Sequence, residues 1–248
     1  MIRLDLKSSL SKFGIGIFET IKVENERPIF LEKHLNRLKV SSSDLDFEIE
    51  NSFFEKLKLE VEMACKERHN EALRLTISKE GYDFEFRNIQ YSKKDYEVGF
   101  KLKKAETIRG NSKLFRYKTC NYMENIIEKN IALKEGFQEA IYFDFENNLL
   151  EGSMSNIFLI DNKDQIVTPS LQKPILPGIM REVVIETAKI KNYKIREDKI
   201  TEKDLLKAKS VFITNSLVEI MWVSSYHKVK YQKSEMIDSL KEQVKLYE

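Results

Sequence analysis

The apolar residues of this chain follow two different periods in both halves, and this mixture limits the folds that it can adopt. Residues 72–78 alternate between apolar and polar side chains, which is typical of a half-buried strand. Residues 31–38 instead place Leu31, Leu35 and Leu38 on one face of a helix. Because strand and helix patterns alternate from end to end, the sequence predicts an α/β (α+β) fold.

The same two periods predict the other elements of the chain. We expect a helix near 51–68, a helix that places Tyr122, Ile126 and Leu133 in period, and a helix over 176–190 that starts after Pro177-Gly178. Short apolar or alternating runs predict strands over 17–23, 84–91, 98–104, 210–215, 219–223 and 228–231, hairpins over 139–152 and 156–169, and further helices over 201–208 and 234–247.

A polar segment with a Gly-Asn-Ser turn at residues 110–112 divides the chain. We therefore predict a smaller N-terminal α/β domain (1–106), an interdomain loop (107–116) and a larger C-terminal domain (117–248). A length of 248 residues is sufficient for two domains of this size.

Composition excludes several classes of function. The 42 Lys and Arg residues nearly balance the 40 Asp and Glu residues, so no net charge favours nucleic acid or a membrane surface. No apolar run reaches the roughly 18 residues of a transmembrane helix, and residues 1–13 lack the apolar core of a signal peptide. The two cysteines form no C-x-x-C pair and the three histidines have no metal-ligand spacing, so we predict a cytoplasmic protein without a metal site.

Three charged residues lie in segments that can carry chemistry. Lys118 follows the polar segment and has aromatic neighbours, which can desolvate a lysine and make it nucleophilic; the alternative is an ordinary surface lysine. Glu151 opens the stretch EGSMSNIF, where a carboxylate can hold a protonated ring nitrogen, or where a tight turn with a positive φ at Gly152 simply ends a strand. Arg37 can bind phosphate bidentately, but it can equally face solvent on its helix.

Two further stretches offer polar groups for an anion. Gly178 and Ile179 begin a predicted helix, whose first N–H groups have no acceptor within the helix. Asn215 and Ser216 end an apolar strand, where α/β proteins often bind ligands. Taken singly, each stretch is more simply explained as a helix start or a strand-end turn.

The order of these stretches is more specific than any one of them. HLNRL, YKTCNY, EGSMSNIF, LPGIMRE and TNSLVEI follow one another as they do in the fold-type IV pyridoxal-phosphate enzymes, and FGIGIFETIKV (13–23) resembles the opening strand of that family. The resemblance covers roughly residues 13–223. This family contains class IV aminotransferases, such as the branched-chain and D-amino acid enzymes, and 4-amino-4-deoxychorismate lyase.

The resemblance implies a fold, a cofactor and a set of site residues. It implies two α/β domains, the larger one barrel-like, with pyridoxal 5′-phosphate in the interdomain cleft of a homodimer. Lys118 would bind the cofactor covalently and move the proton at Cα, and Glu151 would face the pyridine nitrogen and keep it protonated. Arg37, the backbone of Gly178 and Ile179, and the side chains of Asn215 and Ser216 would bind the phosphate, while Ser155 and Asn156 would brace the strand beside the ring.

Two reactions remain open on this resemblance. The lyase would eliminate pyruvate from 4-amino-4-deoxychorismate to give 4-aminobenzoate for folate biosynthesis, and a transaminase would pass the amino group to a keto acid. The TNSL motif, the short chain and the absence of arginine and histidine between Thr76 and Tyr82 favour the lyase, in which Thr20 matches a threonine of the family site. Arg74 remains available for a substrate carboxylate. A non-catalytic binding protein on this fold is a further alternative, although such a protein would not need both Lys118 and Glu151.

Overall fold

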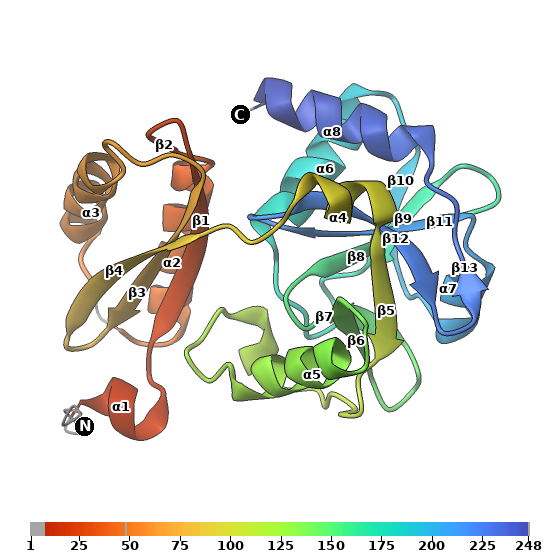
Figure 1. Cartoon of the computed structure of the whole chain (residues 1–248). Coiled ribbons are helices and arrows are strands. Elements are labelled where there is room, and N and C mark those ends of the chain that lie inside the picture. Colours follow the sequence, from red (N-terminus) through yellow and green to blue (C-terminus); the bar gives the residue numbers. More distant parts are fainter. Residues whose placement is uncertain (1–7, 48, 248) are drawn as a thin grey trace. The chain divides into compact units, whose positions relative to one another are not determined.

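The computed structural model describes residues 8–47 and 49–247, which form two compact units, each with its own sheet (Figure 1). The first unit extends to Gln90 and also contains Tyr117–Tyr122. The second contains Tyr91–Arg116 and the chain from Met123 onwards. The first seven residues of the segment that we searched for a signal peptide lie outside the described residues.

The first unit is a four-stranded antiparallel sheet with two longer helices. Its sheet has the order β2-β1-β3-β4. Its elements are α1 (Ser9–Phe13), β1 (Ile17–Glu24), β2 (Arg27–Pro28), α2 (Leu31–Asp44), α3 (Asn51–Ala64), β3 (Glu71–Ser78) and β4 (Gly81–Asn88).

One face of this sheet forms the core of the first unit. Ile17, Ile21 and Val23 alternate along β1 and point to the same cluster as the apolar residues of β3. Apolar residues of α2 and α3, including Leu35 and Leu57, complete the cluster. Because side chains alternate along a strand, Glu19 is also directed to this face, whereas Phe18 and Thr20 point to the opposite one.

The second unit contains a nine-stranded mixed sheet. Eight strands have the order β10-β9-β8-β11-β12-β5-β6-β7, and the ninth, β13, pairs with β12. Its elements are α4 (Lys93–Val98), β5 (Phe100–Lys104), the 3-10 helix η1 (Lys113–Arg116), α5 (Met123–Lys134), β6 (Glu139–Phe143), β7 (Leu149–Gly152), β8 (Asn156–Ile160), β9 (Ile166–Pro169), α6 (Ile179–Ile190), β10 (Ile195–Asp198), α7 (Glu202–Lys207), β11 (Ser210–Asn215), β12 (Glu219–Tyr226), β13 (Val229–Lys230) and α8 (Glu235–Tyr247).

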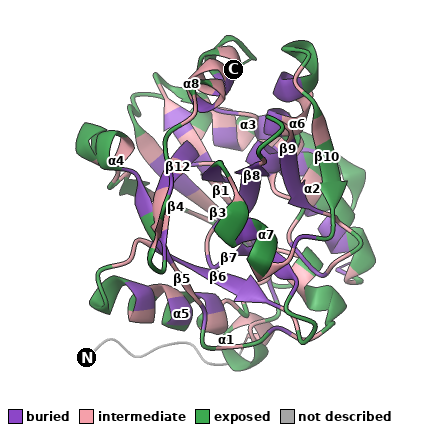
Figure 2. Cartoon of the chain, turned by 90° about the vertical axis from the view of Figure 1, so that its right-hand side faces the viewer, coloured by how far each residue is buried: buried purple, intermediate pink, exposed green. Residues whose placement is uncertain are grey.

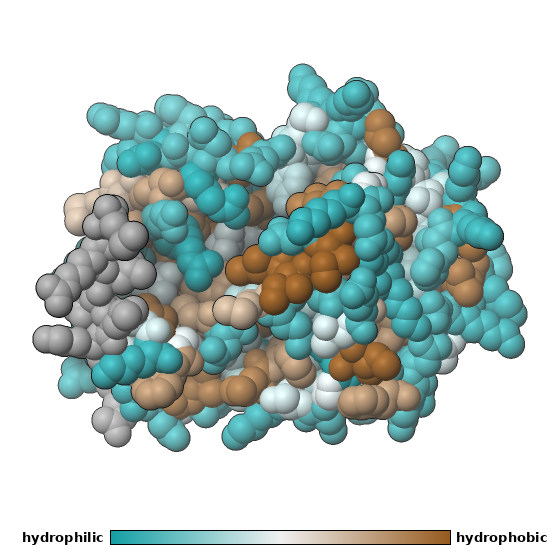
Figure 3. Space-filling view, turned by 60° about the horizontal axis from the view of Figure 1, so that its bottom comes forward, coloured by the Kyte–Doolittle hydropathy of each residue, from teal (hydrophilic) through white to brown (hydrophobic). Residues whose placement is uncertain are grey.

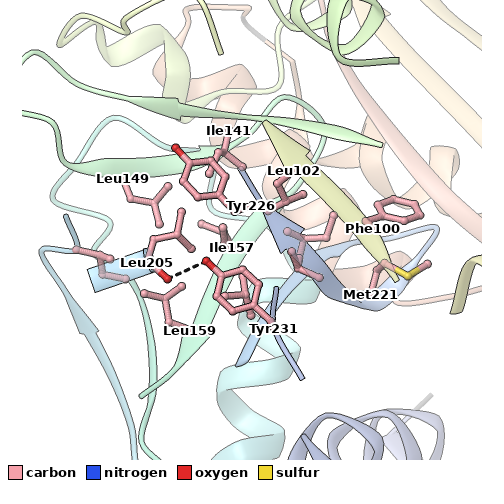
Figure 4. Close-up of a cluster of buried hydrophobic side chains, with 14 of the residues drawn as sticks. Phe100, Leu102, Ile141, Leu149, Ile157, Leu159, Leu205, Met221, Tyr226 and Tyr231 are labelled. Carbon is pink, nitrogen blue, oxygen red and sulfur yellow. Dashed lines mark hydrogen bonds between the residues drawn. The ribbon is translucent and has the colours of Figure 1, made fainter. Parts of the chain in front are cut away.

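This sheet curls around its own apolar cluster. Leu102, Ile141, Leu149, Ile157 and Met221 come from five different strands and lie together in it (Figure 4). β7, at one end of the strand order, also approaches β8. The curled sheet agrees with the barrel-like domain that the family resemblance implied.

The opposite face of β8 and β11 packs on a second layer. Phe158 and Phe212, which are cross-strand neighbours, stack with their ring centroids 4.8 Å apart. Helix α6 contacts β11, and α8 packs against α6. This layer matters for the site because it brings the N-terminus of α6 to the end of the two strands.

Most of the elements that the periodicity predicted are present. The strand at 17–23, the helix at 176–190 and the hairpin at 139–152 are confirmed, and Asn147 has a φ of 60° at the turn of that hairpin. The short elements α1, α4, β2, β10 and η1 had no clear period and were not predicted.

The apolar face predicted for α5 is wrong. Ile126 and Leu133 are about half exposed, whereas Asn125, Glu128 and Ala132 are buried. Figure 2 shows both buried and exposed residues along α5. The reason is that α5 directs polar groups inward. The Asn125 amide donates a hydrogen bond to the Ser153 carbonyl oxygen, and Glu128 accepts bonds from backbone N–H groups at residues 106 and 107.

Several large apolar side chains are exposed as a consequence. Met123, Ile126 and Ile127 on α5 are 73%, 48% and 49% exposed. Figure 3 shows that hydrophobic side chains are exposed in places on one face of the molecule, among mostly hydrophilic ones.

The two units do not follow the domain limits that we predicted at residues 106 and 116. β5 pairs in parallel with β12 and β6, so residues 100–104 belong to the sheet of the second unit. Residues 117–122 belong to the first unit, where the Phe18 N–H donates to the Lys118 carbonyl oxygen at 2.9 Å.

The core of the first unit gives a prediction for stability. Leu75 is fully buried in β3, whereas Leu59 on α3 is 60% exposed. We expect Leu75→Ala to lower the free energy of unfolding by about 2–5 kcal/mol, because it leaves a cavity. Leu59→Ala should change it by no more than about 0.5 kcal/mol. Urea denaturation measures both values, and equal losses would contradict the assignment of this core.

Candidate functional site

The polar face of the first sheet brings together three of the residues that the sequence singled out. Thr20 on β1 is the cross-strand partner of Arg74 on β3. The guanidinium carbon of Arg74 lies 3.7 Å from the ring centroid of Phe18, and the Lys118 Nζ lies 4.3 Å from the same centroid. Two cations therefore contact one aromatic ring beside the Thr20 hydroxyl.

Lys118 lies against aromatic rings, as its sequence surroundings predicted. Its Nζ lies 4.9 Å from the ring centroid of Tyr122, which packs edge-on against Phe18. The hydroxyl of Tyr117, the other aromatic neighbour, donates a hydrogen bond to Asp44 at 3.1 Å.

Arg37 faces the core side of β1 rather than solvent. Its Nε and Nη2 donate to the two carboxylate oxygens of Glu19, at 2.7 and 2.6 Å. His34 Nδ1 lies 2.7 Å from Glu19 Oε2. Burial raises the pKa of Glu19, but the charge of Arg37 and the contacts with Arg37 and His34 lower it by more, and the resulting pKa is about 2. Glu19 is therefore ionised at neutral pH.

In the second unit, Glu151 is held by donors from three segments. Its Oε1 accepts from Arg109 Nη1 at 2.6 Å, and its Oε2 accepts from the Leu176 backbone N–H at 3.0 Å and from Asn156 Nδ2 at 3.3 Å. Arg109 is only 1% exposed and also stacks on Tyr142 at 3.5 Å. The positive charge of Arg109 favours the ionised form of Glu151.

The two serines of EGSMSNIF bind a different carboxylate. The hydroxyls of Ser153 and Ser155 both donate to Glu139 on β6, which is buried. Gly152 does not have the positive φ that we expected for a turn. A Cβ at this position would instead lie 2.3 Å from the Ser155 hydroxyl, so the crowding around Glu139 explains the glycine.

The N-terminus of α6 lies beside Asn156. Gly178 is the N-cap and no side chain caps the helix, while a Cβ on Gly178 would lie 2.0 Å from Asn156 Oδ1. Across the sheet from Asn156, the hydroxyl of Thr214 is buried and has no hydrogen-bond partner among the described residues. The Asn156 amide is not free to donate here, because its Nδ2 donates to Glu151 and to the Leu176 carbonyl oxygen. The helix N-terminus and the buried Thr214 hydroxyl are the groups that suit an anion.

The side chain of Asn215 organises the turn after β11. Its Oδ1 accepts from the N–H groups of Leu217 and Val218, both at 2.9 Å, and its Nδ2 donates to the Met154 carbonyl oxygen. Ser216 follows in this turn and is partly exposed. The turn therefore connects the end of β11 to the EGSMSNIF segment.

Each unit by itself offers groups that fit a part of pyridoxal phosphate. The second unit offers a buried carboxylate for a pyridine nitrogen and an uncapped twelve-residue helix for a phosphate, next to the unpartnered Thr214 hydroxyl. The first unit offers a lysine amine against aromatic rings and an arginine fork. Among the residues that the structure describes, no group of His, Cys, Asp or Glu could hold a metal ion.

Three important residues were not singled out from the sequence. Arg109 lies in the segment that we interpreted as a polar connection, and nothing in its neighbours indicates burial. Glu19 could have been found, because a carboxylate at an inward position of an alternating strand needs a cation partner. Glu139 gave no such signal, since it stands at the first position of its strand.

Comparison with known proteins identifies the family. Residues 16–226 match the model of the class IV aminotransferases, which is most of the chain. The chain therefore belongs to the class IV aminotransferase family, as its sequence motifs indicated. This result confirms the expectation of a pyridoxal-phosphate-dependent enzyme with the fold of that family.

Relatives from two branches of the family resemble this chain to a similar degree. The aminodeoxychorismate lyase of Bacillus subtilis (strain 168) is 28% identical over 235 residues, which is 88% of this chain and 80% of that protein. A D-alanine aminotransferase of Listeria monocytogenes (strain 10403S) is 27% identical over 236 residues, with the same two coverages. The crystal structure of a putative 4-amino-4-deoxychorismate lyase from Legionella pneumophila has a TM-score of 0.82 and 28% identity, and the alignment covers 94% of this chain and 91% of that one.

Within residues 8–47 and 49–247, each helix is too short or too polar to cross a bilayer.

The pair of Arg109 and Glu151 gives a prediction for stability. Arg109→Met would leave the Glu151 carboxylate buried without its cation, which we expect to cost about 3–5 kcal/mol in the free energy of unfolding. The double variant Arg109→Met/Glu151→Leu should recover part of this loss, because it removes the unpaired charge. Urea denaturation measures both effects.

A surface ion pair provides the control for this experiment. Lys199 lies 3.2 Å from Glu146, and both side chains are more than half exposed. Lys199→Met should give no measurable change. A loss for Arg109→Met no larger than that of Lys199→Met would contradict the importance of the buried pair.

Proposed function

We propose that this chain is a pyridoxal-phosphate-dependent 4-amino-4-deoxychorismate lyase, which eliminates pyruvate and leaves 4-aminobenzoate, a step of folate biosynthesis. The observation that carries this proposal is the pair of cations on the Phe18 ring. The amine of Lys118 and the guanidinium of Arg74 both lie against this ring. The substrate has two carboxylates and a carbon acid, so it needs both a carboxylate-binding cation and a base. The resemblance to the Bacillus lyase supports this choice.

The residues that would hold the cofactor follow from the site. Arg37, the N–H groups at Gly178 and Ile179, and Asn215 and Ser216 would bind or frame its phosphate. The hydroxyl of Thr214 can join the residues of the second unit, because it is buried next to Asn156 and has no other described partner.

Lys118 and Glu151 would have the two chemical roles, assisted by residues that hold them. Lys118 would bind the cofactor covalently, and Glu151 would keep the ring nitrogen protonated, with Asn156 and Arg109 fixing its carboxylate and Ser155 fixing the neighbouring turn. Pyridoxal phosphate, when bound, withdraws electrons from the carbon that carries the amino group of the substrate.

Lys118 would carry out the proton transfers of the elimination. Lys118 removes the proton from the carbon that carries the amino group, and the C–O bond to the enolpyruvyl group breaks. The electron pair that remains completes the aromatic ring of 4-aminobenzoate. Lys118 or a water molecule protonates the departing group, which leaves as pyruvate. Thr20 and Arg74 would hold a substrate carboxylate, because they are cross-strand neighbours on the same face.

The second candidate function is an amino acid transaminase of the branched-chain or D-amino acid type. The similarity to the Listeria D-alanine aminotransferase, which has the same coverage as the similarity to the lyase, supports it. In this reaction Lys118 would return the proton to the cofactor, and a keto acid would take the amino group. A non-catalytic binding protein is a third alternative, which the retained Lys118 and Glu151 disfavour.

A homodimer and a cytoplasmic location belong to the same proposal. Met123, Ile126 and Ile127 expose apolar side chains close together on α5. This supports self-association, because apolar side chains that are exposed together favour burial against a partner.

Product analysis tests the proposed reaction. We expect the protein loaded with pyridoxal phosphate to convert 4-amino-4-deoxychorismate to equal amounts of pyruvate and 4-aminobenzoate without a keto acid. Lys118→Ala should lower the rate at least about a thousandfold, since it removes both the covalent link and the base. Lys113→Ala, in an exposed part of η1, serves as the control and should keep full activity.

Other results would contradict the lyase in distinct ways. Turnover of an amino acid that depends on a keto acid, without 4-aminobenzoate formation, would identify a transaminase. A colourless protein whose behaviour does not change in Lys118→Ala would identify the binding protein.

A further inference from the structure

A buried cluster of three ionisable residues lies between β1 and α2 in the first unit. Glu19 and His34 are each 1% exposed, and the Arg37 side chain is 11% exposed. Glu19 accepts from Arg37 Nε and Nη2 and lies 2.7 Å from His34 Nδ1. His34 and Arg37 are three residues apart on α2, so they present both side chains to the same carboxylate.

Burial determines the charge of His34, and its hydrogen bond to Glu19 determines which ring nitrogen carries the proton. Burial lowers the pKa of His34, and the nearby charges of Arg37 and Lys118 lower it further, whereas Glu19 raises it by less than this sum. His34 is therefore neutral at pH 7. An ionised carboxylate only accepts hydrogen bonds, so the single ring proton lies on Nδ1 and donates to Glu19.

These contacts fix the orientation of the Arg37 guanidinium. A carboxylate that binds both Nε and Nη2 must lie in the plane of the fork, which leaves little rotation to the side chain. His34 holds one carboxylate oxygen and so prevents the pair from turning together. The remaining N–H groups of Arg37 then point in one direction.

Charge alone does not explain why Glu19 is present. A carboxylate next to an arginine partly cancels the positive charge that attracts an anion, so it would weaken phosphate binding if attraction were the main contribution. If Glu19 acts by fixing the orientation of Arg37, it instead strengthens phosphate binding, because a pre-organised donor loses less entropy when the ligand binds. The effect of removing the charge of Glu19 therefore distinguishes the two explanations.

We propose that Glu19 and His34 are positioning residues, which orient the guanidinium of Arg37 toward the phosphate of the cofactor. This inference rests on the proposed function, in which Arg37 binds that phosphate. Neither residue needs to touch the cofactor or the substrate.

The test compares two ligands that differ only in the phosphate. Pyridoxal phosphate and pyridoxal are titrated into cofactor-free protein, and their dissociation constants are measured from the absorption band of the lysine-bound form. We expect Glu19→Gln to weaken pyridoxal phosphate about tenfold and to change pyridoxal less than about twofold. Glu24→Gln, a half-exposed carboxylate on the same strand, is the control and should change neither. Tighter binding of pyridoxal phosphate in Glu19→Gln would overturn the proposal.

Arg37→Ala separates this inference from the proposed function. We expect it to weaken pyridoxal phosphate relative to pyridoxal at least as much as Glu19→Gln does, and Glu19→Gln should have no further effect in its background. The quantity to compare is the ratio of the dissociation constant of pyridoxal to that of pyridoxal phosphate. If Arg37→Ala lowers this ratio but Glu19→Gln does not, only the positioning role is overturned. If neither variant changes the ratio, the phosphate role of Arg37 is overturned too.

His34 provides a second variant that keeps the proposal falsifiable if Glu19→Gln does not fold. His34→Asn retains an N–H donor close to the position of Nδ1, and His34→Leu does not. We expect the ratio to fall in His34→Leu and to be largely restored in His34→Asn, and equal losses in both would overturn the role of the hydrogen bond. Nitrogen NMR of the cofactor-free protein should show the Nδ1–H tautomer of His34, and the other tautomer would contradict the arrangement.

Discussion

Buried carboxylates impose the strongest constraint on this structure. Glu19, Glu139 and Glu151 are between 1% and 6% exposed, and a carboxylate without partners could not be buried at an acceptable free energy. Each one therefore needs donors, and the donors come from segments far apart in the sequence. Glu151 alone fixes Arg109, Asn156 and the backbone at Leu176.

The three carboxylates have different kinds of partners. Glu19 and Glu151 each bind an arginine, whose positive charge favours the ionised form of a carboxylate. Glu139 binds two serine hydroxyls instead, and its nearest cation, Lys129, is 3.9 Å away. The arginine-bound carboxylates stand next to the residues with proposed chemical or phosphate-binding roles, whereas Glu139 holds a turn. The carboxylates of the candidate site therefore bind arginine, whereas the carboxylate that stabilises a neighbouring turn binds serine hydroxyls.

The sequence predicted what local periods determine and missed what long-range pairing determines. Alternation along 17–23 and the Pro-Gly helix start at 177–178 are local, and both elements formed as expected. The inward face of α5 was predicted wrongly, because Asn125 and Glu128 are buried by partners that lie outside the helix. Arg109 could not be recognised for the same reason, since its partner Glu151 is 42 residues away.

For the candidate site residues, the sequence identified the family but not the side-chain contacts. The order of five motifs was specific enough to identify the family, and the family match now confirms it. The contacts of Ser155 with Glu139 and of Asn215 with its own turn could not be derived from those motifs, because they depend on side-chain directions at the ends of β7 and β11. Relatives of both kinds, lyases and transaminases, share the fold, so the fold does not decide between the two reactions.

Lys118 is the residue on which the proposed chemistry depends most directly, because it would hold the cofactor. The decisive measurement is reduction of the protein loaded with pyridoxal phosphate by borohydride, followed by peptide mass spectrometry. We expect one modified peptide, which contains Lys118, with the mass of the reduced cofactor. Stoichiometric modification of a different lysine, or none at all, would contradict this role of Lys118.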